Sequence, residues 1–148
     1  MSAPFIMLVD DEVTFVETLA KRLAERNIET ITAFSAEEGL KKLKNNKNLE
    51  VIVLDIKMPG MDGIEALEEL KKVSPLIEVI MLTGNATIES AINAMKLGAY
   101  DFIMKPFDIE ELVCKVEAAT NKKREHAEKI KDAQKQETLS KYGPFRYV

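Results

Sequence analysis

The hydrophobic positions of this chain alternate five times between two patterns. Short runs rich in apolar and β-branched residues are typical of buried strands, and they occupy residues 5–9, 29–34, 51–54, 77–82 and 101–104. After each run, apolar residues recur three or four positions apart, which is the spacing of one face of a helix. The alternation predicts a doubly wound α/β fold, (βα)5, with helices on both faces of a five-stranded parallel sheet.

Four of the expected helices begin with a capping pair, in which a Ser, Thr or Asp is followed three residues later by Glu. The pairs are Thr14 with Glu17, Ser35 with Glu38, Asp62 with Glu65 and Asp108 with Glu111. We expect the last helix to run on past residue 120, because residues 121–136 contain no Gly or Pro and are rich in helix-forming residues.

The composition is that of one ordinary domain with a short excess. The 148 residues are 46% hydrophobic and 31% charged, with a single cysteine. One cysteine excludes an internal disulfide framework and a cysteine-cluster zinc site. The longest apolar run covers residues 5–9 only, which excludes a membrane span and a secretory signal. We therefore expect a cytoplasmic protein that does not associate with a membrane.

Charge is distributed unevenly along the chain. Residues 1–120 carry 13 Lys and Arg against 21 Asp and Glu, whereas residues 121–148 carry 8 against 4. An acidic body argues against direct DNA binding by this chain. We expect a domain over residues 1–120 and a C-terminal helical extension with an aromatic tail over 121–148. The extension is interpreted as a solvated helix, with a dimerisation or docking helix as the alternative.

Polar residues follow the predicted strands at the edge where ligands bind in such sheets. Asp10, Asp11, Asp55, Thr83 and Lys105 each come directly after a strand or end one. Three carboxylates in one cleft repel, so either one pKa is raised or a hard divalent cation such as Mg²⁺ offsets the charge. A carboxylate can also act as a nucleophile and carry an acyl phosphate. The cleft therefore suits a phosphoryl group on or beside a carboxylate.

With these motifs in order, the chain resembles the receiver domain of two-component response regulators. The match covers roughly residues 4–120, and it is carried by the segments 9–12, 55–63, 83–84 and 98–107. The resemblance implies the flavodoxin-like sheet order, in which the first and third strands are neighbours. Residues 83–107 are similar to receivers of the enhancer-binding transcription-factor branch.

The resemblance also implies a role for each acidic residue. Asp55 is expected to be the phosphoacceptor. Asp11 is expected to bind Mg²⁺ directly, Asp10 through water, and Lys57 through its backbone carbonyl. The side chains of Lys57 and Asn85 would border the path of attacking water and so tune the lifetime of the phosphorylated state.

Three further residues take switch and binding roles by the same resemblance. Thr83 and Lys105 would each bind a phosphoryl oxygen, and the Lys105–Pro106 peptide bond would be cis. Phe102 occupies the position of the switch aromatic. Movement of Thr83 toward the phosphoryl group would let Phe102 rotate inward and change the surrounding surface.

The implied function is that of a phosphorylation-activated signalling domain and not an ordinary enzyme. Its donor would be a sensor histidine kinase or a histidine phosphotransfer protein. The domain would promote its own phosphotransfer and autodephosphorylation, and phosphorylation would switch partner binding or oligomerisation, with a homodimer among the outcomes. We expect either a stand-alone receiver or one cut from a longer regulator.

The alternative function is a Mg²⁺-dependent phosphohydrolase with Asp55 as nucleophile. Lys57 argues against it, because hydrolases of the haloacid type carry a second Asp at that position. A docking module that is never phosphorylated would not need the complete acid, Thr and Lys set. The aromatic residues of 142–148 are left with three readings: docking on the same domain, binding a partner, or the stub of a removed domain.

Overall fold

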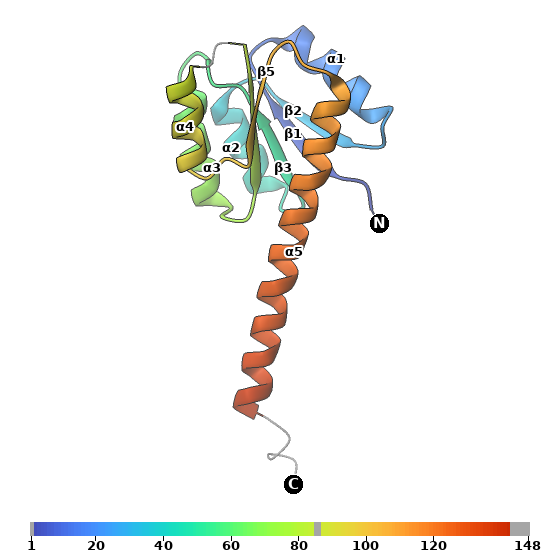
Figure 1. The fold of residues 1–148 in the computed structure, drawn as a ribbon, viewed down its shortest axis with the longest axis vertical. Helices are drawn as coiled ribbons and strands as arrows, with labels where there is room; N and C mark the ends of the chain where they lie inside the picture. The colour runs from blue at the N-terminus through green and yellow to red at the C-terminus, as the bar shows by residue number, and fades with distance from the viewer. Residues whose placement is uncertain (1, 85–86, 143–148) are drawn as a thin grey trace.

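The computed structural model describes residues 2–84 and 87–142, with side chains up to residue 139. Five strands and five helices alternate along the described chain (Figure 1). In order they are β1 (Phe5–Val9), α1 (Val13–Ala24), β2 (Glu29–Ala33), α2 (Ala36–Asn45), β3 (Val51–Leu54), α3 (Gly63–Val73), β4 (Glu78–Thr83), α4 (Ile88–Lys96), β5 (Asp101–Met104) and α5 (Ile109–Tyr142). All strand pairs are parallel, in the order β2-β1-β3-β4-β5. The predicted flavodoxin-like (βα)5 fold is confirmed.

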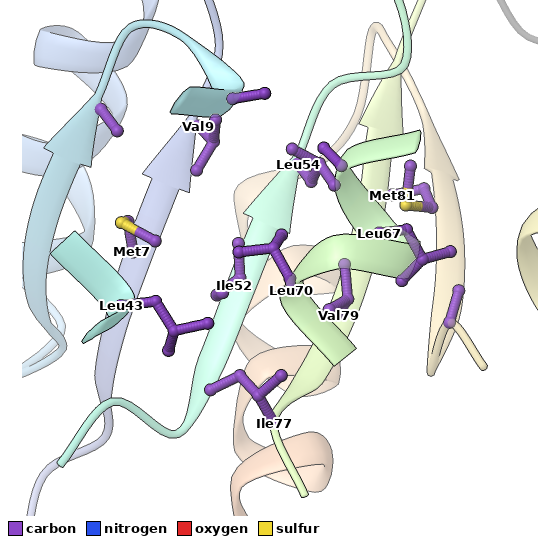
Figure 2. Close-up of a cluster of buried hydrophobic side chains, with 14 of the residues drawn as sticks. Met7, Val9, Leu43, Ile52, Leu54, Leu67, Leu70, Ile77, Val79 and Met81 are labelled. Carbon is purple, nitrogen blue, oxygen red and sulfur yellow. The ribbon is translucent and has the colours of Figure 1, made fainter. Parts of the chain in front are cut away.

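Two hydrophobic clusters cover the two faces of the sheet. Because side chains alternate along a strand, Met7 and Val9 of β1 point to one face and Ile6 and Leu8 to the other. Figure 2 shows the first cluster, where Leu43 of α2 and Leu67 and Leu70 of α3 pack against β1, β3 and β4. Ala94 of α4 belongs to this cluster too. The second cluster joins the sheet to α1 and α5.

Three of the four predicted helix caps are present. Ser35 accepts from the backbone N–H of Glu38, and Asp62 accepts from those of Ile64 and Glu65. Asp108 accepts from Glu110. These side chains satisfy N–H groups that have no partner inside the helix.

The cap predicted at Thr14 is wrong. α1 begins at Val13, two residues before the start that a Thr14 cap implies, so Thr14 lies inside the first turn. Glu12 precedes the helix without capping it through its side chain, and its own N–H donates to Oδ1 of Asp10 at 3.0 Å. A capping box at α4 went unrecognised in the sequence, because its second member is Ser90 rather than Glu; Thr87 and Ser90 bond each other's backbone N–H groups.

Helix α5 continues beyond the sheet, as predicted, and projects from the body as a single helix (Figure 1). Arg124 joins its first exposed turns to the amino edge of the sheet through both carboxylate oxygens of Glu50, at 2.5 and 2.9 Å. Described side chains from 125 to 139 are all exposed. Within the described residues, no helix combines the length and apolar character that crossing a membrane requires.

Candidate functional site

The acidic residues at the carboxyl edge of the sheet lie together. Asp10 follows β1 and Asp55 follows β3, and these strands are neighbours. The N–H of Asp55 donates to the carbonyl of Val9 at 3.0 Å, which holds the two strand ends side by side. Carboxylate oxygens of Asp10, Asp11 and Asp55 all lie within 4.8 Å of one another. The structure thus gathers the three predicted acids at one point.

The carboxylates of this cluster differ in their surroundings. Asp10 and Asp55 are buried, at 4% and 6% exposed, whereas Asp11 is exposed. Burial raises the pKa of the Asp55 carboxyl above its ordinary value; a hydrogen bond with Thr83 opposes this rise, and the charge of Asp10 adds to it. Among the described residues, none hydrogen-bonds Oδ1 of Asp55. A buried oxygen of this kind beside two more carboxylates fits a hard divalent cation such as Mg²⁺.

A positive charge and a hydroxyl border the acids. The ammonium of Lys105, just after β5, lies 2.8 Å from Oδ2 of Asp10 and 3.8 Å from Oε1 of Glu12. This charge partly offsets the rise in the pKa of Asp55 that burial causes. Thr83, the last residue of β4, is fully buried. Strands β1, β3, β4 and β5 therefore each contribute to one cleft, which suits a group carrying negatively charged oxygens.

The loop after β3 folds back against its own strand. The N–H of Gly63 donates to the carbonyl of Ile56 at 2.6 Å, and a Cβ at position 63 would lie 2.2 Å from the carbonyl oxygen of Asp55. Gly60 has φ of 81°, a conformation that favours glycine. The side chain of Lys57 is exposed. Glycine at position 63 thus lets α3 begin directly against the backbone of Asp55 and Ile56.

The remaining predicted residues lie near the cleft or outside the described chain. Phe102 on β5 is half-buried and packs against the first cluster. The Lys105–Pro106 peptide bond is cis. Asn85 falls outside the residues that the structure describes.

Two aromatic residues beside the cleft were not expected from the sequence. The Lys105 ammonium lies 4.0 Å from the centre of the Phe15 ring. That ring meets Phe107 edge-on, with centroids 6.4 Å apart and planes at 84°. Both rings line a groove of about 350 Å³ between α1 and the segment after β5. The one signal in the sequence is that Phe15 stands four residues after Asp11, close in the chain to the predicted acids.

Comparisons with known proteins point to one family. The model of the response regulator receiver domain matches residues 6–117. A putative NtrX-like response regulator of Rickettsia felis is 38% identical over 85% of this chain, and the DNA-binding transcriptional regulator NtrC of Escherichia coli K12 is 35% identical over 80%. The chain spans about a quarter of the length of these relatives, 27% and 25%.

Solved structures agree with the fold. The receiver domain of NtrX from Brucella abortus superposes with a TM-score of 0.73 at 39% identity, over 78% of this chain and 98% of that domain. A CheY-like receiver domain from Methanospirillum hungatei gives a TM-score of 0.79 at 31% identity, over 84% and 99%.

Proposed function

The chain belongs to the response regulator receiver domain family, and from that premise we propose that Asp55 is its phosphoacceptor. The observation that carries the proposal is the position of Asp55: a buried carboxylate beside two acids and a lysine, with one oxygen that no described residue hydrogen-bonds. The domain is a signalling domain of the kind found in NtrX-like and NtrC regulators.

The proposed reaction is phosphoryl transfer from a phosphohistidine to Asp55. A carboxylate oxygen of Asp55 bonds to phosphorus while the bond from phosphorus to the imidazole nitrogen breaks, and the electron pair stays on the imidazole. The nucleophile must be ionised, yet its burial favours the neutral form. Lys105 opposes that effect. Once the acyl phosphate is formed, Thr83 and Lys105 would each bind one of its oxygens.

The proposed cofactor is Mg²⁺, held by Asp10, Asp11 and Asp55 with the backbone carbonyl of Lys57. Bound there, it would withdraw negative charge from the phosphoryl oxygens. The oxygen-only donor set supports this assignment, and so does the Asp55 oxygen that lacks a hydrogen-bond partner among the described residues. Asp11 is exposed and open to a direct bond, whereas Asp10 is already engaged with Lys105.

The proposed signalling role follows from the same cleft. Residues 1–120 would act as the receiver and 121–148 as its extension, in the cytoplasm. A sensor histidine kinase or a histidine phosphotransfer protein would supply the phosphoryl group. Thr83 and Phe102 would pass the change to the surface and so alter partner binding or oligomerisation. Autodephosphorylation would end the signal, with Lys57 and Asn85 setting its lifetime.

The test is incubation with acetyl phosphate and Mg²⁺, followed by intact mass. We expect a gain of about 80 Da, one phosphoryl group, in the wild type and none in Asp55→Asn or in EDTA. Asp132→Asn, on the exposed part of α5, is the matched control and should behave as the wild type. Continuous turnover of a generic phosphoester without a stable adduct would instead favour a phosphohydrolase.

A further inference from the structure

We propose that Phe15 is a positioning residue for Lys105, and that its ring face holds the ammonium at the cleft by a cation–π interaction. The inference rests on the proposed function of the cleft. The distance of 4.0 Å from Nζ to the ring centre is well inside the range of about 6 Å over which such attraction acts. The Lys105 side chain is only 18% exposed, so little water screens the contact.

The ammonium of Lys105 needs a contact that persists when the cation site is filled, because its ion pairs with acidic residues are then weakened. Its ammonium is paired with Asp10 at 2.8 Å. Asp10 is also assigned to the cation site, and a carboxylate turned toward a cation attracts the ammonium less. The second acid, Glu12, is farther away at 3.8 Å and its side chain is 65% exposed. The attraction of the Phe15 ring does not depend on the charge state or coordination of Asp10.

The ring is itself held in position. Phe15 stands in the first turn of α1, and Phe107 meets it edge-on. Both residues pack against the second hydrophobic cluster. The four-carbon stem of a lysine is flexible. A fixed ring face therefore restricts the positions open to the ammonium of Lys105 when it leaves Asp10 for a phosphoryl oxygen.

Fluorinated phenylalanines separate this role from packing. One, two or three fluorines at Phe15 weaken the negative face of the ring while its shape changes little. With acetyl phosphate and saturating Mg²⁺, we expect the phosphorylation rate to fall stepwise with each fluorine, by about three- to tenfold for the trifluoro ring. The same series at Phe5, which begins β1 at the strand end opposite the cleft and packs against the first cluster, is the control and should leave the rate unchanged. A phosphorylation rate that does not change with fluorination at Phe15 would overturn the proposal.

A second readout needs neither metal nor phosphorylation. In the metal-free wild type, the ring should shield the Hε protons of Lys105, giving an upfield NMR shift. Phe15→Leu should remove the shift, and Phe15→Trp should keep it. Unshifted protons in the wild type would contradict the proposal. Failure of the wild type to accept a phosphoryl group would count against Asp55 as acceptor. A wild type that is phosphorylated, at a rate that fluorines at Phe15 leave unchanged, would count against the role of Phe15 alone.

Discussion

The ammonium of Lys105 lies 2.8 Å from Oδ2 of Asp10. The residue assigned to a phosphoryl oxygen is thus paired with a residue assigned to the cation. In this arrangement, Lys105 supplies positive charge that offsets the buried acids. A cation in the acidic cluster would compete with the lysine for Asp10, so the two positive charges should oppose each other's binding.

Replacing Lys105 should therefore separate cation binding from phosphorylation. We expect Lys105→Met to bind Mg²⁺ more tightly, by about threefold or more, because a neighbouring positive charge is removed. The same variant should be phosphorylated more slowly, since a charge that binds a phosphoryl oxygen is lost. Isothermal titration calorimetry and the initial rate with acetyl phosphate measure the two effects. Weaker Mg²⁺ binding by the variant would contradict the competition.

The raised pKa of Asp55 predicts the pH dependence of stability without metal. Burial is the largest cause of the rise, so the folded protein holds this proton more tightly than the unfolded chain does. The stabilisation that comes from this tighter proton binding is fully present below the ordinary pKa of 3.8. It is lost as pH rises through the pKa of Asp55 in the folded protein. In EDTA at neutral pH, we expect Asp55→Asn to unfold at higher urea than the wild type, with the difference vanishing below pH 3.8.

Added Mg²⁺ should narrow that difference, because it binds the folded wild type and stabilises it by mass action. Asp132→Asn, at an exposed position, should show no such difference at any pH. A wild type more stable than Asp55→Asn in EDTA at neutral pH would show that the carboxylate is better compensated than its burial indicates.

The turn behind Asp55 should not tolerate a side chain at Gly63. A Cβ there would lie 2.2 Å from the Asp55 carbonyl oxygen and 2.5 Å from Cα of Ile56, so backbone has to move. We expect Gly63→Ala to lower the free energy of unfolding by about 1–3 kcal/mol. Gly84→Ala is the control, because among the described residues its Cβ would meet the Lys105 side chain alone, at an ordinary 3.7 Å. Equal urea midpoints would refute the steric account.

The pair between Arg124 and Glu50 should fix the base of the projecting helix. Glu50 is 14% exposed at its side chain and also accepts from the N–H of Phe5. We expect Arg124→Ala to cost about 1–3 kcal/mol, because a mostly buried carboxylate loses its charged partner. Amide hydrogen exchange near residues 2–5 and 121–130 should speed up. Lys131→Ala, farther along the exposed helix, should change neither the stability nor the exchange rates. Identical exchange in both variants would show that the Arg124–Glu50 pair does not fix the base of the helix.

The fold could be predicted because each strand and helix has a recognisable local pattern of apolar residues. The run 51–54 is buried on both sides in the sheet centre, as its β-branched composition indicated. The start of α1 could not be predicted the same way. There the side chain of Asp10 binds the N–H of Glu12, and the helix begins before Thr14.

The candidate site was predictable as a set of residues and not as a set of contacts. Parallel strands bring Asp10 and Asp55 to one edge of the sheet, whatever the orientation of their side chains. The pair Lys105–Asp10 joins positions 95 apart in the chain, and Arg124–Glu50 joins positions 74 apart. Such contacts depend on side-chain orientations that only the assembled fold determines, as does the position of Phe15 against Lys105.

The identity of the phosphorylated residue decides the central claim. Borohydride reduces an aspartyl phosphate to homoserine, which peptide mass mapping locates in the chain. After acetyl phosphate and Mg²⁺, we predict homoserine at position 55 alone in the wild type and in Asp132→Asn, and none in Asp55→Asn. Homoserine at Asp10 or Asp11, or a phosphoryl mass gain with no homoserine at position 55, would contradict the assignment of Asp55 as phosphoacceptor.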